Sequence, residues 1–261
     1  MKKLTVKGKY FMLALDQRGS FRRMLKTSTK KKIISVKKDI LETIGKHSSA
    51  ILLDPVYGKK LAKNVKKPLL FCMEKSGYEK YKGYRKTKLQ PNWNVKKAKK
   101  SGADAIKLNL FYNPNAPEKI LEHQKKIVLK IGKSCKTNKI PFLLEILTYN
   151  CNKSTSIIKS VLEFKQSKYN VAVFKLEYPG NLKTCKKITK ILSKIPWVLL
   201  SAGKPMKTFS SGLKIAMKGG CSGFLAGRAI WQKGLKTKKK REWFEKKGVK
   251  NIKELISIVR K

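Results

Sequence analysis

Eight short apolar segments, separated by longer lysine-rich stretches, constrain the fold of this chain more than any other feature of its sequence. Each segment has the length of a β-strand, and most of the stretches between them have the length of a helix. The segments cover residues 10–16, 50–55, 68–74, 105–112, 141–149, 171–178, 197–203 and 223–230. Eight buried strands alternating with helices in 261 residues predict an α/β protein, a (β/α)8 TIM barrel.

A doubly wound open sheet is the alternative fold, but no GxGxxG motif follows the first segment. The stretch 118–131 places its apolar residues on one stripe and predicts an amphipathic helix. Residues 242–261 predict a final amphipathic helix, and residues 75–92 predict a long mobile loop above the third strand. No linker is evident, so we expect residues 1–261 to form a single (β/α)8 barrel domain.

The charge of the chain is extreme. It has 64 Lys and Arg against 15 Asp and Glu, a formal net charge of +49, and only seven of the basic residues are arginine. Lysines occur in nearly every expected helix and loop, which favours compositional drift, such as a genome rich in lysine codons, over a dedicated polyanion-binding surface. With either origin, we expect the surface to attract anionic substrates and to bind nucleic acid non-specifically at low salt.

The five cysteines are scattered, with no CxxC motif and no Cys/His cluster. This pattern argues against a metal site and against disulfides, and it is typical of a reducing compartment. The basic N-terminus is followed by no apolar segment long enough for a signal peptide or a membrane span. We therefore expect a cytoplasmic protein that does not bind membranes.

A lysine, Lys175, lies in the middle of the apolar segment 171–178. An ammonium among apolar side chains is unfavourable unless it pairs with a carboxylate or loses its proton. Side chains alternate between the two faces of a strand. Lys175 therefore shares one face with Glu177, whereas Phe174 and Leu176 lie on the other. The apolar face suits a layer of helices, and the charged face suits a barrel interior.

Charged residues occupy comparable places in other segments. Lys107 lies in the fourth segment and Glu145 in the fifth, each opposite a mainly apolar face. Asp16 ends the first segment, and catalytic groups of barrels gather at the carboxyl ends of strands. A structural ion pair between Lys107 and Glu145 is the alternative, but buried pairs contribute little to stability. Three internal charges on adjacent strands therefore favour an active site.

These three residues suit amine catalysis. A lysine is a nucleophile only as the neutral amine. Lys107, as a second ammonium nearby, would repel a proton on Lys175, and burial would add to this effect. Glu145 would move protons while a carbinolamine forms and loses water. The pattern predicts Lys175, Lys107 and Glu145 as catalytic residues.

The last two segments end in small residues and an arginine. Ser201 and Gly203 end the seventh segment, and Gly227 and Arg228 lie in the eighth. Phosphate sites of barrels commonly use these two loops and the helix N-terminus that follows, with backbone N–H groups as donors. Arginine can bind an oxyanion through two parallel hydrogen bonds. The pattern predicts a site for phosphate or a similar tetrahedral anion.

Six motifs between residues 10 and 231 together resemble a known family. They are LALDQRGSF (13–21), LLDP (52–55), GADAIK (102–107), LEILTY (144–149), FKLEYP (174–179) and LSAG (200–203) with Gly227-Arg228. In this order they resemble the class I tagatose-1,6-bisphosphate aldolase family, and the related sulfofructose-phosphate aldolases share much of the pattern. The resemblance implies a Schiff base at Lys175 and acid–base catalysis by Glu145. It also implies substrate contacts from Asp16, Gln17, Lys107, Ser201, Gly203 and Arg228.

The function expected is that of a class I aldolase. It would reversibly cleave a ketose 1,6-bisphosphate such as tagatose 1,6-bisphosphate into dihydroxyacetone phosphate and glyceraldehyde 3-phosphate. No metal or other cofactor is expected, because the iminium accepts the electron pair. A sulfofructose-phosphate aldolase and a non-catalytic polyanion-binding barrel are the alternatives, and a phosphosugar isomerase would not need the lysine of the sixth strand. The partners expected are a phosphorylated ketose and further copies of the chain in a homo-oligomer.

Overall fold

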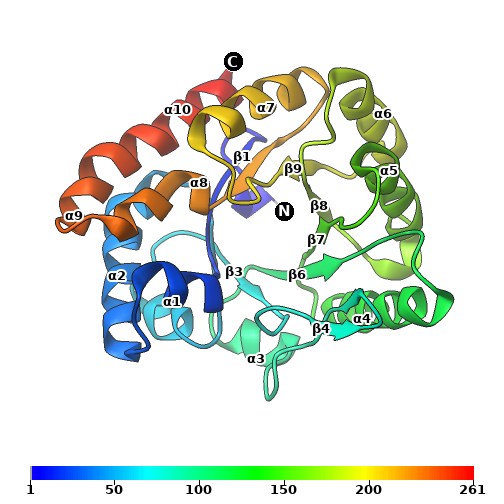
Figure 1. The fold of residues 1–261 in the computed structure, drawn as a ribbon, viewed down its shortest axis with the longest axis horizontal. Helices are drawn as coiled ribbons and strands as arrows, with labels where there is room; N and C mark the ends of the chain where they lie inside the picture. Colours follow the sequence, from blue (N-terminus) through cyan, green and yellow to red (C-terminus); the bar gives the residue numbers. More distant parts are fainter. Residues whose placement is uncertain (1) are drawn as a thin grey trace.

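A closed barrel of eight parallel strands forms the centre of the computed structural model, which describes residues 2–261 apart from the side chain of Lys2 (Figure 1). Around the barrel the strands follow the order β1-β10-β9-β8-β7-β6-β3-β2. Their bounds are β1 (Tyr10–Leu15), β2 (Ile51–Leu53), β3 (Leu69–Cys72), β6 (Ala105–Phe111), β7 (Phe142–Leu147), β8 (Val173–Leu176), β9 (Trp197–Leu199) and β10 (Gly223–Ala226). The closed ring confirms the predicted (β/α)8 barrel and excludes the open sheet. Met1, which the predicted domain 1–261 includes, lies outside the described residues.

Helices surround the barrel and cover its outer face (Figure 1). They are α1 (Gly19–Leu25), α2 (Lys30–Thr43), α3 (Val95–Lys100), α4 (Glu118–Thr137), α5 (Lys153–Phe164), α6 (Leu182–Leu192), α7 (Met206–Lys218), α8 (Arg228–Trp231), α9 (Lys240–Trp243) and α10 (Val249–Arg260). The helix predicted over 118–131 is the first part of α4. The predicted C-terminal helix begins two residues early, with α9, and continues through a π-helical turn at Phe244–Gly248 into α10. This last helix packs against α7 and β1.

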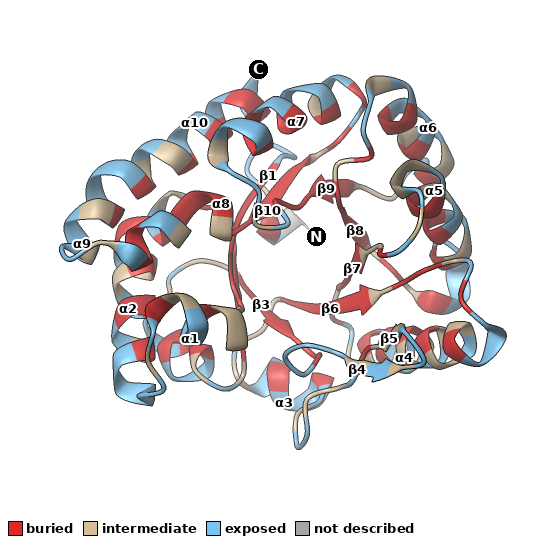
Figure 2. Ribbon diagram, viewed as in Figure 1, coloured by how far each residue is buried: buried red, intermediate tan, exposed pale blue. Residues whose placement is uncertain are grey.

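Strand side chains form two apolar layers, one inside the barrel and one beneath the helices. Met12, Ala14 and Leu52 belong to the inner layer, whereas Phe11 and Leu13 belong to the outer layer. Figure 2 shows the same arrangement, with buried strands at the centre and helices that are buried on the inward side and exposed on the other. The alternation expected from the sequence is therefore confirmed, and it aims every second strand residue at the barrel axis.

Pairing of β1 with β10 closes the barrel, and two glycines allow the backbones to approach each other closely there. Tyr10 lies opposite Gly223 in the register of the two strands. A β-carbon on Gly223 would overlap the carbonyl oxygen of Tyr10, and one on Gly227 would overlap that of Ala14. Gly223 also has a φ of +136°, which other residues rarely adopt. The last strand therefore needs both glycines to reach the first.

The segment predicted as a long mobile loop, 75–92, contains regular structure, so that prediction was wrong. β4 (Glu79–Tyr81) and β5 (Tyr84–Lys86) form an antiparallel hairpin. The two residues between them, Lys82 and Gly83, have φ values of +47° and +79°. Positive φ at both central positions is typical of the tight turn that matches the twist of a hairpin. The signal was present in the sequence as a Lys-Gly pair between two tyrosine-containing segments.

A fully buried lysine joins α2 to the carboxyl ends of β1 and β2. Nζ of Lys37 forms an ion pair with Asp54 and donates a hydrogen bond of 2.8 Å to the carbonyl oxygen of Leu15. The other oxygen of Asp54 accepts hydrogen bonds from the backbone N–H groups of Val56 and Tyr57. These contacts fix the ends of both strands directly beside Asp16.

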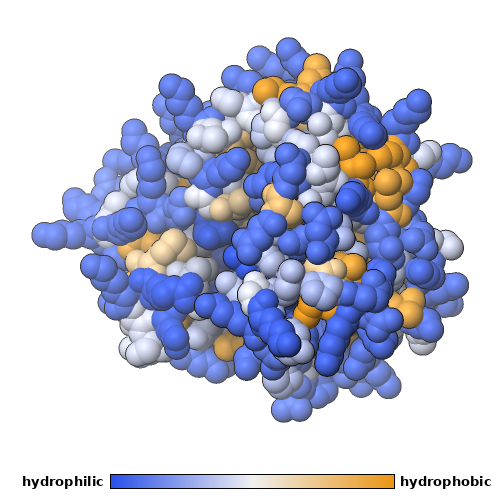
Figure 3. Space-filling view, turned by 45° about the vertical axis from the view of Figure 1, so that its right-hand side comes forward, coloured by the Kyte–Doolittle hydropathy of each residue, from blue (hydrophilic) through white to orange (hydrophobic). Residues whose placement is uncertain are grey.

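Hydrophilic side chains dominate the molecular surface, as Figure 3 shows for one face. Apolar groups occur there as separate small patches. Within residues 2–261, no helix is both long and apolar enough to cross a membrane. The described surface therefore matches the lysine-rich composition of the chain.

Candidate active site

Lys107 is held by three carboxylates inside the carboxyl end of the barrel. Its Nζ lies 2.9 Å from Oδ2 of Asp16, 2.7 Å from Oε1 of Glu74 and 2.6 Å from Oε2 of Glu145. The Lys107 side chain is only 3% exposed, so water does not screen these contacts. Lys107 is therefore the centre of a buried cluster of ionised groups.

Glu145 contacts both lysines of the predicted site. Its Oε1 lies 2.9 Å from Nζ of Lys175, and its other oxygen contacts Lys107. The sequence predicts direct repulsion between the two ammonium groups. The structure differs, because Glu145 lies between them and Asp16 and Glu74 also neutralise Lys107. The predicted residues come together, but direct repulsion between the lysines is offset by these carboxylates.

The strand register explains why these side chains meet. Asn109 of β6 lies opposite Glu145 of β7, which in turn lies opposite Lys175 of β8. All three share the inward face of their strands with apolar residues of the inner layer, such as Leu143 two residues before Glu145. Lys107 lies one row lower, opposite Leu143, and its long side chain reaches up to the carboxylates. Period-two alternation on neighbouring strands therefore builds the cluster.

The pKa values of the cluster follow from burial and charge. Burial alone would lower the pKa of Lys107, but Asp16, Glu145 and Glu74 outweigh it and raise this pKa well above the usual value. Burial would raise the pKa of Asp16 and of Glu145, but Lys107 and then Lys175 outweigh it and lower both values. Near neutral pH, Lys107 is an ammonium, and Asp16 and Glu145 are carboxylates.

Glu74 is a member of this cluster that sequence reasoning missed. One oxygen of its carboxylate contacts Lys107, and the other accepts a hydrogen bond of 2.9 Å from the backbone N–H of Asn109. Its carbonyl oxygen accepts a hydrogen bond of 2.7 Å from Nη2 of Arg18. Glu74 ends the third apolar segment and lies two residues beyond the inward-facing Cys72. The argument that selected Asp16 would therefore have selected Glu74.

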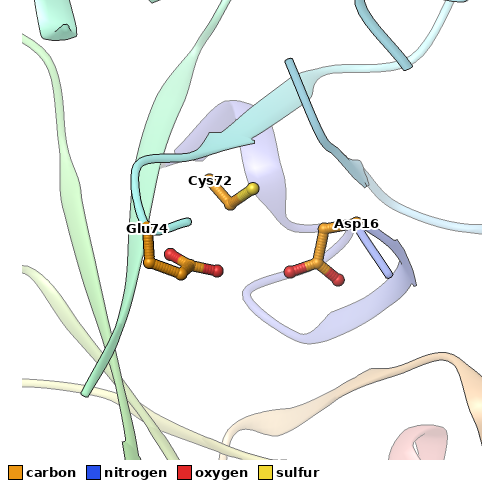
Figure 4. Close-up of side chains that lie close together, drawn as sticks. All are labelled: Asp16, Cys72 and Glu74. Carbon is orange, nitrogen blue, oxygen red and sulfur yellow. The ribbon is translucent and has the colours of Figure 1, made fainter. Parts of the chain in front are cut away.

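Asp16, Cys72 and Glu74 also form a group with the spacing of metal ligands. One ligand atom of each lies within 4.8 Å of the others, and Figure 4 shows both carboxyl groups and the thiol facing a common space. Lys107 already contacts both carboxylates with its ammonium. Burial, and then the charge of Glu74, raise the pKa of Cys72 well above the usual value, so its thiol keeps its proton and is a poor ligand. The cation that balances the two carboxylates of this group is therefore the ammonium of Lys107.

The loops after β9 and β10 place the predicted anion-binding residues together. Ser201 is buried, and Gly203 has a φ of +78°. The guanidinium of Arg228 lies against Gly203, since a β-carbon on this glycine would lie 3.1 Å from Cζ of Arg228. Gly227, directly before Arg228, packs on β1 as described above. The half-buried Arg228 has no carboxylate partner among the described residues, which leaves its guanidinium available to an anion.

The remaining predicted contact, Gln17, follows Asp16 at the end of β1. Its side chain is half-buried, and its buried Oε1 has no hydrogen-bond partner within residues 2–261 as described. Around the ring, Lys107 on β6 is followed by β7 and β8 in one direction and by β3, β2 and β1 in the other. Asp16 and Gln17 follow β1 and thus approach Lys107 from the side away from β7 and β8. The predicted residues therefore line several sides of one barrel mouth.

A closed parallel barrel with ionised side chains converging inside the carboxyl ends of its strands is the architecture of a TIM-barrel enzyme. The family described as "DeoC/LacD family aldolase" matches residues 10–233, and the chain belongs to this family of aldolases, which are lyases. The family predicted from the six sequence motifs is thereby confirmed.

Two relatives are similar over nearly the whole chain. Tagatose 1,6-diphosphate aldolase 1 of Enterococcus faecalis is 33% identical over 290 aligned residues, which cover 95% of this chain and 89% of that protein. Tagatose 1,6-diphosphate aldolase 2 of Streptococcus pyogenes serotype M1 is 30% identical over 306 aligned residues, which cover 100% of this chain and 94% of that protein.

Solved structures of aldolases share the fold. A Schiff base-forming fructose-1,6-bisphosphate aldolase has a TM-score of 0.68 at 15% identity, and the match covers 99% of this chain and 97% of that aldolase's chain. An archaeal fructose-1,6-bisphosphate aldolase, with its catalytic lysine bound to the carbinolamine intermediate of its substrate, has a TM-score of 0.68 at 14% identity. That match covers 100% of this chain and 97% of the archaeal chain. At these identities the likeness establishes the fold alone.

Proposed function

We propose that this chain is a class I aldolase that forms a Schiff base at Lys175. It reversibly cleaves a ketose 1,6-bisphosphate such as tagatose 1,6-bisphosphate into dihydroxyacetone phosphate and glyceraldehyde 3-phosphate. The names of the two relatives support this substrate. The observation that carries the proposal is the buried contact of 2.9 Å between Nζ of Lys175 and Oε1 of Glu145, next to a lysine that stays charged.

The two buried lysines have different environments, which supports different roles. Three carboxylates hold Lys107 as an ammonium, so it has no lone pair to offer a carbonyl group. Lys175 contacts one carboxylate, and it shares this carboxylate with Lys107. Lys175 is therefore the nucleophile in our proposal, and Lys107 is a fixed positive charge that orients Glu145 and stabilises anionic oxygen atoms of the substrate.

Glu145 accounts for the proton transfers. As a carboxylate in contact with Lys175, it can take the proton that the amine loses when nitrogen bonds to C2 of the ketose. The same proton, passed on to the C2 oxygen, completes the hydroxyl group of the carbinolamine. A further proton, which Glu145 takes up from solvent and gives to this hydroxyl, lets water leave and the iminium form, and it returns to solvent when the iminium is hydrolysed. Glu145, again a base, then takes the proton of the C4 hydroxyl while the C3–C4 bond breaks. The electron pair of that bond moves to the iminium nitrogen, and the aldehyde leaves.

Protonation of the resulting enamine at C3 and addition of water to C2 complete the reaction. These steps release dihydroxyacetone phosphate and restore the amine of Lys175. The phosphate group on C1 is bound by the loop from Ser201 to Gly203 and by Arg228, whose guanidinium lies at that loop and pairs with no carboxylate of the described part of the chain. The substrate is therefore anchored on the β9–β10 side of the barrel, beside the strand that carries Lys175.

Borohydride trapping tests the proposed function. The protein is incubated with dihydroxyacetone phosphate, reduced with borohydride, digested and examined by mass spectrometry. Reduction locks the iminium as a secondary amine, and we expect the label on the peptide that contains Lys175. A free lysine side chain has a pKa of about 10.4 and is almost wholly protonated near neutral pH, so exposed lysines should react little.

The Lys175→Ala variant is the control, and it should lose that labelled peptide. Label spread over many surface lysines, with no enrichment at Lys175, would contradict the aldolase mechanism and favour a polyanion-binding barrel. Cleavage should be unchanged by EDTA, because in this mechanism the iminium is the electron acceptor. A strong loss of activity with EDTA would contradict the Schiff base chemistry.

Arg228→Ala is expected to raise KM for the phosphorylated ketose. A charge-assisted hydrogen bond contributes about 1.5–3 kcal/mol, which corresponds to roughly ten- to 150-fold in KM. Steady-state cleavage kinetics measure the effect. Lys204→Ala removes a positive charge from an exposed side chain of the same loop and is the matched control, with little change expected. Equal KM values for Arg228→Ala and the wild type would remove Arg228 from the anion site.

A further inference from the structure

Among the described residues, three buried side-chain atoms have no hydrogen-bond partner: Oε1 of Gln17, Nε of Arg18 and Oδ1 of Asn109. All three lie at one end of the barrel, since Gln17 and Arg18 follow β1 and Asn109 lies near the end of β6. Buried polar atoms without partners are rare, because they have lost their hydrogen bonds to water. Their grouping at the barrel mouth points to a ligand that supplies the missing hydrogen bonds.

Asn109 is the one of these residues that lies in the same row as the proposed nucleophile. In the strand register it is opposite Glu145, which is opposite Lys175. Its backbone N–H is bonded to Glu74, so the main chain at Asn109 is fixed. The residue is only 8% exposed, and its side-chain amide makes no hydrogen bond with any described residue. The amide therefore contributes nothing to the internal hydrogen bonding of the barrel.

The ring order of the strands fixes which part of the substrate reaches Asn109. In the proposed function, the C1 phosphate lies at the loops after β9 and β10, and C2 is bonded to Lys175 on β8. Glu145 on β7 serves the C4 hydroxyl. The next strand along the ring is β6, which lies across the barrel from β10. A ketose that follows this path has its C5 hydroxyl beside the side chain of Asn109.

We propose that the side-chain amide of Asn109 hydrogen-bonds the C5 hydroxyl of the ketose, and that Asn109 thereby determines specificity for the aldehyde half of the substrate. The inference rests on the proposed function, because it requires C2 on Lys175. A carboxamide presents a donor and an acceptor side by side, and a hydroxyl group can satisfy either. After cleavage this hydroxyl is the one next to the aldehyde carbon of glyceraldehyde 3-phosphate.

Such a contact selects against an aldehyde that lacks the hydroxyl. When the deoxy aldehyde binds, the Asn109 amide stays buried without a partner, and this state is unfavourable. A site built to bond a hydroxyl therefore rejects an analogue without it more strongly than an apolar pocket would. Replacement of Asn109 by leucine, whose side chain has the same branching and number of heavy atoms, removes both the contact and the penalty.

The test is the condensation of dihydroxyacetone phosphate with two aldehydes, glyceraldehyde 3-phosphate and its deoxy analogue 3-oxopropyl phosphate. For Asn109→Leu we expect kcat/KM to fall about tenfold with glyceraldehyde 3-phosphate and much less with the analogue. The ratio of the two kcat/KM values, which expresses the preference for the hydroxylated aldehyde, should therefore collapse. The same two kcat/KM values are measured for Asn109→Ala. This variant also removes the amide, so it tests the proposal even if Asn109→Leu folds poorly.

Borohydride trapping with dihydroxyacetone phosphate separates the possible failures, since this half of the substrate carries no C5 hydroxyl. Label at Lys175 in the wild type and both variants, with the aldehyde preference lost only in the variants, supports the assignment. Equal losses with both aldehydes, or an unchanged preference, would overturn the role of Asn109 and leave the aldolase mechanism standing. A wild type without any Lys175 adduct would refute the proposed function, and the role of Asn109 with it.

Discussion

Lys175→Ala is expected to lower kcat for ketose bisphosphate cleavage by at least about a thousandfold, because loss of the nucleophile removes the covalent route altogether. Folding should survive. Glu145 loses one of its two lysines, but it keeps the contact of 2.6 Å with Lys107, so no buried carboxylate is left without a cation. A coupled assay for glyceraldehyde 3-phosphate measures the activity, and a thermal melt reports on folding.

Lys186→Ala is the matched control for this variant. Lys186 is exposed on α6, the helix that follows β8, and its replacement should leave kcat within about a factor of two, as for surface substitutions in general. If Lys175→Ala kept more than about a tenth of the wild-type activity, the Schiff base would lie on another residue. A large loss accompanied by a collapsed melting transition would instead show that Lys175 supports the fold.

Lys107→Met is expected to destabilise the protein by about 3–5 kcal/mol near neutral pH, because it leaves buried carboxylates without their main cation. Asp16 and Glu74 lose their ion pair with Lys107, and Glu145 keeps only Lys175. Activity should be lost as well, since the charge that orients Glu145 is gone. Urea unfolding at about pH 7 and about pH 5 gives the free energies of unfolding. Lys175→Met, which leaves every carboxylate paired, is the control with the smaller loss.

The pKa shifts on folding determine how the stability of the wild type depends on pH. In the wild type the pKa values of Asp16 and Glu145 are lowered on folding. Their contribution to stability is complete above the unfolded carboxyl pKa of about 4, and it is lost as the pH falls through the folded values. The pKa of Lys107 is raised on folding. Its contribution is complete below the unfolded lysine pKa of about 10.4, and it is lost as the pH rises through the folded value.

Without Lys107, burial instead raises the carboxyl pKa values. The buried carboxylates then destabilise the folded protein near neutral pH, and this destabilisation decreases as they take up protons at lower pH. The deficit of Lys107→Met relative to the wild type should therefore shrink between about pH 7 and about pH 5. A variant as stable as the wild type near neutral pH, or a deficit that grows on acidification, would show that the carboxylates do not depend on Lys107.

The sequence predicted the barrel well because the information that specifies it is local. Each of the eight apolar segments contains one strand, and period-two alternation assigned the inward residues correctly on β6, β7 and β8. The hairpin of β4 and β5 escaped prediction because its strands are short and rich in lysine and tyrosine, so they lack an apolar core face. The segment 223–230 predicts one strand, but this prediction is wrong in its second half, because β10 ends at Ala226 and α8 begins at Arg228.

The candidate site was predictable only in part, because its energetics depend on neighbours that are distant in sequence. Alternation located Lys107, Glu145 and Lys175. It gave no indication that Glu145 would lie between the two lysines, since this follows from side-chain lengths and strand register in the closed barrel. Glu74 and Asn109 carried a usable signal, as polar residues on the inward face of predicted strands. The sequence could not show that the Glu74 carboxylate is paired, whereas the Asn109 amide makes no hydrogen bond to the residues that the structure describes.

The glycine-lined seam between β1 and β10 has a consequence for how the chain is made. Tyr10 and Gly223 are partners across this seam, so one edge of β1 has no neighbour until most of the chain has left the ribosome. An unpaired strand edge is a template for association with other chains, and contacts so distant in sequence form slowly. A nascent chain with the composition of this protein repels its copies, because the full chain carries a net charge of +49. The net positive charge therefore opposes association of incomplete barrels through the open edge of β1.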